Sequence, residues 1–295
     1  MTTQRFAVIG SAVAGSASPR MHAAAYAALG LDCTYGAVLA SDRDLPGLVA
    51  RLRSGELSGL NVTMPHKRRI LELVDAVDSS ARTVGAANTL VRDPNGRIVA
   101  YNTDVLAIAE ELRRLAPDVP LTEGWMKSRA LVLGTGATAR SAIVALAHHL
   151  GVAEIVIRGR ALENENSRDA FTAEITELLT RAGAMCALLM QPWVPDAAID
   201  QRVLAVIQAT NVGSQGGDPG EAAGDAVAWE AISPDGVALD VVYDPPVTPF
   251  LGAARAHGLR AANGKGMLAR QGALAFELWF DQPAPFDVML AAVSA

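Results

Sequence analysis

Residues 130–139 read Ala-Leu-Val-Leu-Gly-Thr-Gly-Ala-Thr-Ala, a short apolar run that leads into a glycine-containing turn. A helical pattern then continues to Leu150. A strand, a Gly-x-Gly-x-x-Ala turn and a helix in this order are typical of the first unit of a dinucleotide-binding fold. Gly134 permits the tight turn, Gly136 lets the backbone approach a pyrophosphate, and Ala139 lies where the helix meets the strand. The stretch therefore predicts dinucleotide binding; the alternative is a structural turn that binds nothing.

The end of the next strand indicates which dinucleotide is bound. Strand 154–157 is followed by Arg158-Gly-Arg160, and no carboxylate occurs until Glu163. An NAD site usually has an acidic residue about 20 residues after the turn, which binds the ribose 2′-hydroxyl. Guanidinium groups suit a 2′-phosphate, because they are permanently charged and can bind it with two hydrogen bonds. The sequence therefore favours NADP, and NAD is the alternative cofactor. The other interpretation is that both arginines are solvated surface residues that bind no cofactor.

Strands and helices alternate on both sides of this stretch. Downstream we expect a helix over 168–182, strands over 184–190, 203–208 and 237–242, and a glycine-rich loop over 213–224. Upstream we expect strands over 6–9, 34–39, 59–62, 87–91 and 97–101, and helices from Ser18, after Ser41, over 72–84 and over 105–115. Alternation of this kind predicts an α/β fold with mostly parallel sheets. A new series of alternating strands and helices begins after residues 104–120, which predicts two domains, 1–104 and 105–266.

Composition supports two domains and excludes several classes of protein. The chain has 295 residues, of which 51% are hydrophobic and 19% charged, enough apolar surface for a packed core. A net charge of −6 argues against a nucleic-acid-binding surface. Cys33 and Cys186 form no disulfide framework and have no metal-ligand spacing, so we expect no metal and a reducing cytoplasm. The longest uncharged stretch, 203–217, has only 15 residues, which predicts no membrane span.

Four short polar clusters lie at junctions between predicted strands and helices of the first domain: Ser16-Ala-Ser18-Pro, Asn61-Val-Thr-Met-Pro-His-Lys67, Gly85-Ala-Ala-Asn88-Thr and Asn102-Thr-Asp104. Taken singly, each reads as a helix cap, a surface charge or a turn. In α/β folds, however, ligands bind beyond the carboxyl ends of the strands. One lysine, one aspartate and several hydroxyl and amide groups suit a small polyhydroxylated anion.

Together these clusters resemble the shikimate dehydrogenase family. Residues 61–67 match the family's NVTxPHK motif, and residues 85–89 and 102–104 are similar to its GAxNT and NTD segments. Residues 240–248 and 264–271 resemble its C-terminal signature. The motifs occur in the family's order from about residue 6 to residue 280.

The resemblance implies a two-domain enzyme that reduces 3-dehydroshikimate to shikimate with NADPH, reversibly. It implies a substrate domain with a mostly parallel sheet, a Rossmann-type dinucleotide-binding domain, and a C-terminal helix, about 267–295, that returns to the first domain. Lys67 and Asp104 would be the catalytic pair. The remaining implied site residues are, for the substrate carboxylate, Ser16, Ser18 and Tyr243; for the ring hydroxyls, Thr63, Asn88 and Gln271; and for the cofactor, Gly134, Gly136, Ala139, Arg160, Thr210 and Gly264.

The chain departs from the family pattern in three places. Gly15 stands where the family often has histidine, residues 134–138 replace the common GAGGA loop, and Gly159 and Ala161 flank the family's arginine, Arg160. Two alternatives therefore stay open: a dehydrogenase of quinate or a related cyclic polyol acid, with NAD as its alternative cofactor, and a metabolite or nucleotide sensor without turnover. We expect small-molecule partners, no nucleic acid or membrane, and a monomer or homodimer.

Overall fold

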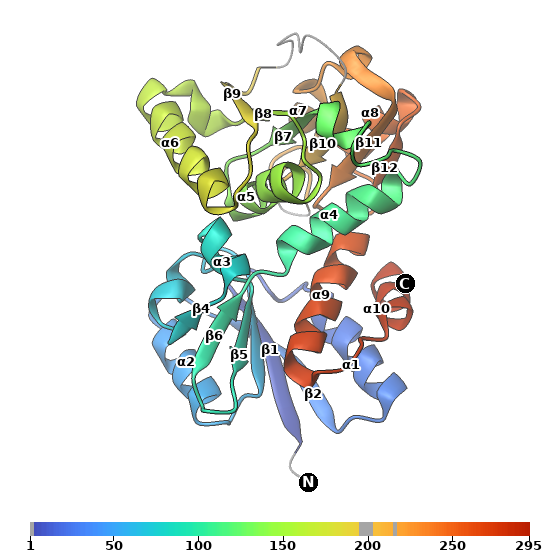
Figure 1. Cartoon of the computed structure of the whole chain (residues 1–295). Helices are drawn as coiled ribbons and strands as arrows, with labels where there is room; N and C mark the ends of the chain where they lie inside the picture. Colours follow the sequence, from blue (N-terminus) through green and yellow to red (C-terminus); the bar gives the residue numbers. More distant parts are fainter. Residues whose placement is uncertain (1–2, 195–202, 215–216) are drawn as a thin grey trace. The chain divides into compact units, whose positions relative to one another are not determined.

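The computed structural model describes residues 3–194, 203–214 and 217–295 and forms two compact units (Figure 1). Unit 1 consists of the chain up to Asp104 together with residues 268–295, and unit 2 consists of residues 105–267. Each unit is built around a six-stranded sheet, so the predicted α/β class is confirmed.

The sheet of unit 1 has the strand order β2-β1-β3-β5-β6-β4. Its strands are β1 (Gln4–Gly10), β2 (Cys33–Leu39), β3 (Gly59–Val62), β4 (Ala76–Val77), β5 (Thr89–Arg92) and β6 (Ile98–Tyr101). β1 pairs in parallel with β2 and β3, and β4 with β6, whereas β5 runs antiparallel to β3 and β6. The parallel strands β1 and β3 therefore end at the same edge, where the loops that carry Ser16 and Lys67 begin.

Helices cover both faces of this sheet. They are α1 (Ser18–Leu29), α2 (Leu45–Arg53), α3 (Ser79–Val84), α9 (Lys265–Phe280) and α10 (Phe286–Ser294). Side chains of β1 alternate between the faces. Ala7 and Ile9 join a core cluster that includes Leu48 of α2, while Phe6 packs its ring against Trp279 of α9 at 4.8 Å between centroids. Residues 268–280 thus form part of the core of unit 1.

The single helix expected over 72–84 is wrong. The chain forms a 3₁₀ turn over Arg69–Glu72, the short strand β4, and then α3. Polar side chains make these breaks. Asp75 accepts a hydrogen bond from the backbone N–H of Ile98 in β6, at 2.8 Å, and Asp78 caps α3 by accepting from the N–H of Ser80, also at 2.8 Å. Both aspartates offer the backbone an alternative to helical hydrogen bonds.

Unit 2 has a fully parallel sheet with the order β12-β11-β10-β7-β8-β9. Its strands are β7 (Arg129–Leu133), β8 (Glu154–Arg158), β9 (Ala187–Gln191), β10 (Val203–Gln208), β11 (Ile232–Asp240) and β12 (Arg260–Ala262). Its helices are α4 (Asp104–Leu115), α5 (Ala137–Val144), α6 (Glu165–Arg181), α7 (Glu221–Asp225) and α8 (Pro249–Ala256). The chain builds the sheet outward in one direction from β7 to β9 and in the other direction from β10 to β12, so the strand order reverses between β7 and β10. Doubly wound sheets bind dinucleotides at such a reversal point.

Two further differences from the sequence prediction lie in unit 2. α7 begins at Glu221, inside the expected glycine-rich loop, of which residues 215–216 lie outside the described residues. α8 and β12 were not predicted, and in unit 1 the C-terminal helix expected over about 267–295 is divided into α9 and α10. Within the described residues, no helix is both long enough and apolar enough to span a membrane.

Candidate active site

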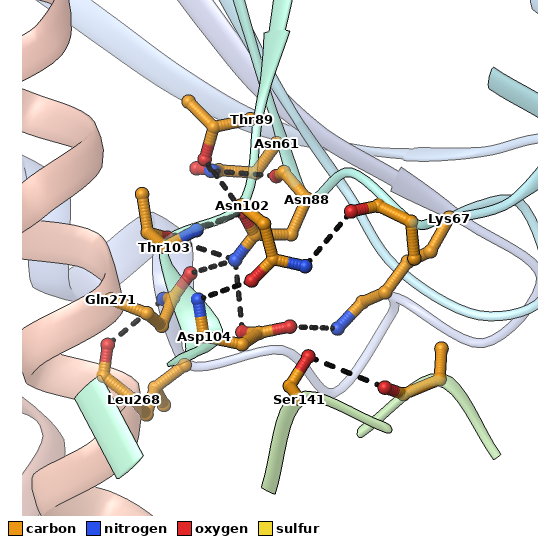
Figure 2. Close-up of polar contacts among 12 residues, drawn as sticks. Asn61, Lys67, Asn88, Thr89, Asn102, Thr103, Asp104, Ser141, Leu268 and Gln271 are labelled. Carbon is orange, nitrogen blue, oxygen red and sulfur yellow. Dashed lines mark hydrogen bonds and ion pairs between the residues drawn. The ribbon is translucent and has the colours of Figure 1, made fainter. Parts of the chain in front are cut away.

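A buried ion pair lies at the strand ends of unit 1 (Figure 2). Lys67 follows β3, and Asp104 is the first residue of α4; Lys67 Nζ donates to Asp104 Oδ2 at 2.7 Å. The two side chains are only 11% and 5% exposed. Buried charges are tolerated when their remaining hydrogen-bonding atoms are satisfied, and the other oxygen of Asp104 does have a donor, described next.

Asn88 connects this pair to the C-terminal helix. Its Nδ2 donates to Asp104 Oδ1 at 2.9 Å, to Thr103 Oγ1 at 2.9 Å and to Gln271 Oε1 at 3.4 Å. An amide nitrogen has only two hydrogens, so three acceptors share them. The Gln271 contact is the longest of the three and therefore the weakest. The structure thus brings Lys67, Asn88, Asp104 and Gln271 together.

The main chain around the pair is fixed by neighbouring polar groups. The carbonyl oxygen of Lys67 accepts from Ala87 N at 2.7 Å, and Asn102 Oδ1 accepts from Asp104 N at 3.0 Å. His66 is 1% exposed, and its two ring nitrogens each lie 2.8 Å from an oxygen, of the Asp42 carboxylate and of the Ala40 carbonyl. The motif histidine therefore anchors the loop that presents Lys67.

Three more predicted substrate residues are Ser16, in the loop after β1, Ser18, at the start of α1, and Thr63, directly after β3. Ser18 is buried, Ser16 and Thr63 are partly buried, and Ser18 N donates to Ser16 Oγ at 3.3 Å. Thr63 N donates to the Ile9 carbonyl at 2.9 Å, which ties the two loops together. A Cβ atom at Gly10 would collide with the Thr63 methyl group. Glycine is thus required at position 10. The sequence alone shows only that Gly10 ends an apolar strand and does not predict this close approach to Thr63.

The glycine turn of unit 2 has the geometry of a phosphate-binding loop. Gly134 has φ 116°, and a Cβ atom there would lie 2.7 Å from Thr210 Cγ2, so only glycine fits. Gly136 is the N-cap of α5 and has open space around its Cα, while Ala139 is fully buried. A backbone cradle at a helix N-terminus is able to bind phosphate. These residues fit the pyrophosphate of a dinucleotide.

The two arginines after β8 have different surroundings. Arg158 is fully buried and donates to Gln191 Oε1 at 2.9 Å and to the Ala226 carbonyl; burial lowers the pKa of its guanidinium. Arg160 is exposed. Its Nη2 lies 2.6 Å from Asp218 Oδ2, and its guanidinium lies 5.9 Å from the ring centre of Trp193. Only Arg160 can reach a ligand, and no sequence pattern pointed to its partner Asp218.

The remaining predicted residues also lie in unit 2. Thr210 follows β10, and its backbone N–H donates to Gln208 Oε1 at 2.6 Å. A Cβ atom at Gly264 would collide with the Val241 carbonyl, so this glycine permits a close backbone approach. Tyr243 is partly buried after β11, and its grouping with the serines of unit 1 stays a prediction. In the described part of the chain, no group of three or more His, Cys, Asp or Glu residues is placed to hold a metal ion.

Known proteins of one family match this chain in sequence. The family model of the shikimate dehydrogenase substrate binding domain matches residues 8–90, and that of the shikimate 5′-dehydrogenase C-terminal domain matches residues 264–293. The NADP(+) shikimate dehydrogenase of Synechocystis sp. is 35% identical over 291 residues, which cover 99% of this chain and 95% of that protein.

Solved structures of similar proteins share both units. Shikimate 5-dehydrogenase from Thermus thermophilus, in complex with NADP(H) and shikimate, has a TM-score of 0.77 at 33% identity, covering 99% of this chain and 98% of that one. Quinate dehydrogenase from Corynebacterium glutamicum, in complex with NAD, has a TM-score of 0.81 at 26% identity, covering 98% of each chain. With the motifs in order and identity extending over nearly the whole length of its relatives, the chain belongs to the shikimate dehydrogenase family.

Proposed function

We propose that this protein catalyses the reversible, NADP-dependent reduction of 3-dehydroshikimate to shikimate. The observation that carries the proposal is the buried Lys67–Asp104 pair, which the amide of Asn88 links to Gln271, in a chain of this family. A purely structural salt bridge would not need this arrangement of amides around it. Relatives named as NADP(+) shikimate dehydrogenases support both the substrate and the cofactor.

Lys67 acts as the acid–base residue in this proposal. The reduced nicotinamide supplies a hydride when it is bound, and hydride addition to a ketone leaves negative charge on the carbonyl oxygen. Lys67 Nζ donates a proton to that oxygen, and in the oxidation of shikimate it takes the proton back. Asp104 holds Nζ in place and balances its charge. Positioned acid–base catalysis contributes about 10²- to 10⁴-fold in rate.

The other predicted residues bind the two ligands. Ser16, Ser18 and Tyr243 hold the substrate carboxylate, and Thr63, Asn88 and Gln271 bind the ring hydroxyls. On unit 2, Gly134, Gly136 and Ala139 form the phosphate loop, Arg160 binds the 2′-phosphate, and Thr210 and Gly264 lie by the nicotinamide half. We further propose small-molecule partners only, a cytoplasmic location, and a monomer or homodimer.

The test is absorbance of the reduced nicotinamide with purified protein and four combinations of shikimate or quinate with NADP or NAD. We expect shikimate with NADP to give the highest kcat/KM. A clear preference for quinate or NAD would support the alternative dehydrogenase instead. Two observations are the reason for including quinate and NAD. A Cβ atom at Gly15, where the family often has histidine, would meet open space, and Asp218 already forms an ion pair with Arg160, the proposed 2′-phosphate residue. No turnover of either acid would favour the sensor.

Lys67→Ala tests the assigned acid–base residue. We expect kcat to fall by about 100-fold or more, with a much smaller change in KM, because the lysine stabilises charge that develops in the transition state. Steady-state kinetics with shikimate and NADP measure both constants. Asp104→Asn should also lower kcat, because the lysine loses its charged partner. A kcat within a few-fold of wild type for Lys67→Ala would remove Lys67 from the mechanism.

A further inference from the structure

A continuous line of hydrogen bonds runs through unit 1 and ends at the candidate catalytic aspartate (Figure 2 shows its last steps). Tyr35 Oη donates to Asn61 Oδ1 at 2.7 Å, and Asn61 Nδ2 donates to Thr89 Oγ1 at 3.0 Å. Thr89 Oγ1 donates to Asn88 Oδ1 at 3.1 Å, and Asn88 Nδ2 donates to Asp104 Oδ1 at 2.9 Å. Every group donates to the next, so the bonds reinforce one another.

The direction of the line is fixed at Asn61. Besides Thr89, Asn61 Nδ2 donates to the main-chain carbonyl of Asn88 at 3.1 Å, and a carbonyl oxygen can only accept. The Asn61 amide therefore cannot be reversed, and its oxygen must face the Tyr35 hydroxyl. Because Thr89 Oγ1 accepts from Asn61, its own hydrogen is left for Asn88 Oδ1.

This direction and the main-chain N–H of Thr103 together determine which end of the Asn88 amide faces Asp104. An asparagine amide is nearly symmetrical in shape, so only its hydrogen bonds distinguish oxygen from nitrogen. The oxygen of Asn88 accepts from Thr89 Oγ1 and from Thr103 N, the latter at 2.9 Å. A reversed amide would place its NH₂ against the Thr103 N–H and its oxygen against the Asp104 carboxylate, and both contacts are repulsive.

We propose that Tyr35, Asn61 and Thr89 are positioning residues that orient the Asn88 amide and, through it, the Asp104 carboxylate beside Lys67. These three residues, here called the orienting chain, are 9%, 6% and 0% exposed, so they act from beneath the site. The inference rests on the proposed function in taking Lys67 and Asp104 as the acid–base pair.

Thr89 offers a matched pair of variants. Thr89→Val keeps the shape and removes the hydroxyl, whereas Thr89→Ser keeps the hydroxyl and removes a methyl group. We expect Thr89→Val to lower kcat for shikimate by about 10- to 100-fold, because a small displacement of a catalytic group costs that much. Thr89→Ser should stay within about 3-fold of wild type. Equal loss in both variants would mean that Thr89 serves packing alone and would overturn the proposal.

Tyrosines supply a second comparison. Tyr35→Phe removes the first donor of the orienting chain, at a greater distance from Asp104, and we expect kcat to fall by only about 3- to 10-fold. Tyr26→Phe is the control: Tyr26 is 2% exposed in the same aromatic cluster, and its hydroxyl has no hydrogen-bond partner in the described part of the chain. It should leave kcat unchanged. Equal effects of the two tyrosine variants would contradict the orienting chain.

A readout independent of turnover separates this inference from the proposed function. The side-chain amide hydrogens of Asn88, assigned in NMR spectra by comparison with Asn88→Asp, should exchange slowly with water in the wild type and in Thr89→Ser. In Thr89→Val they should exchange at least about 10-fold faster. If the wild type does not turn over shikimate, the proposed function fails, yet this difference still supports the orienting chain. Identical exchange in the two Thr89 variants overturns it whatever the activity.

Discussion

His22 is the buried titratable residue of unit 1 that has no hydrogen-bond partner for either ring nitrogen among the described residues. Its ring stacks on Tyr35 with 4.3 Å between centroids and 5° between the ring planes. Burial lowers its pKa to about 3, so the imidazole is neutral at any ordinary pH. It therefore acts as an aromatic spacer behind the first residue of the orienting chain, and it makes folding depend on pH.

The sign of that dependence follows from proton binding. Below pH 6.5 the unfolded chain protonates His22, while the folded protein does not until about pH 3. The contribution to stability is thus complete above pH 6.5 and is lost as pH falls. We expect the unfolding free energy to drop by about 1.4 kcal/mol per pH unit in this range, beyond the drop in His22→Phe. Urea unfolding at pH 7.5, 6.0 and 5.0 measures both proteins; parallel curves would refute the prediction.

At this scale the sequence predicts which residues gather but not how they are oriented. Lys67 and Asp104 follow β3 and β6, and Asn88 precedes β5; because β5 runs antiparallel to both of those strands, its start lies at the edge where they end. The difference between Arg158 and Arg160 was not predictable, because it depends on distant groups. Gln191 and the Ala226 carbonyl accept from Arg158 in the core, whereas Asp218 and Trp193 lie beside Arg160.

Among the elements, the loops after β8, β9 and β10 together form the proposed 2′-phosphate site. They carry Arg160, Trp193 and Asp218, respectively. The Asp218 carboxylate forms an ion pair with the Arg160 guanidinium and would compete with a 2′-phosphate for it. The same carboxylate can accept a hydrogen bond from a ribose 2′-hydroxyl. The ion pair is exposed on both sides, so its effect is modest and depends on salt.

Cofactor selectivity should change in opposite directions in two variants. Arg160→Ala should raise KM for NADPH and leave KM for NADH nearly unchanged, because only NADPH carries the 2′-phosphate. Asp218→Asn should lower KM for NADPH by about 2- to 5-fold, since a competing exposed charge is worth up to about 1 kcal/mol. KM for both cofactors, at low and high salt, measures these effects.

Asp235→Asn provides the control, because Asp235 is another exposed aspartate of unit 2 and lies in β11. Equal losses with both cofactors in Arg160→Ala would mean that Arg160 supports the fold or the adenine pocket.

Element prediction succeeded where periodicity was long and failed where side chains interrupt it. β7, α5 and β8 follow the apolar pattern and the glycine turn. The expected helix over 72–84 failed because Asp75 and Asp78 bind backbone N–H groups, one of them in a strand remote in sequence. β12 has three residues, too few for a period to be visible.

At the scale of the molecule, unit 1 is made of two chain segments separated by all of unit 2. Residues 268–295 contribute Gln271 to the site and Trp279 to the core, where Trp279 Nε1 donates to the Leu90 carbonyl at 3.1 Å. Arg20 Nη2 of α1 also donates to the Val293 carbonyl of α10, at 3.1 Å. Unit 2, in contrast, is continuous in sequence.

A chain truncated after Met267 should therefore lose one unit and keep the other. We expect no shikimate turnover and no cooperative unfolding of unit 1, because its aromatic face loses its cover. Binding of NADPH to unit 2, measured by nicotinamide fluorescence, should stay within about 3-fold of the full chain. Gln271→Ala is the control that removes a site residue and keeps the fold. Loss of NADPH binding in the truncated chain would show that unit 2 depends on unit 1.

The two-segment construction of unit 1 also sets the order of events on the ribosome. β1, β2 and β3 are made first, but α9, which covers Phe6, is made only after unit 2. At about 5–20 residues per second, the interval is on the order of 10 s. Unit 2 can fold within that time, whereas the aromatic face of β1 is covered only in part, by Tyr26 of α1. The nascent chain therefore exposes an apolar surface during most of its synthesis, and this is the stage at which a chaperone can bind to it.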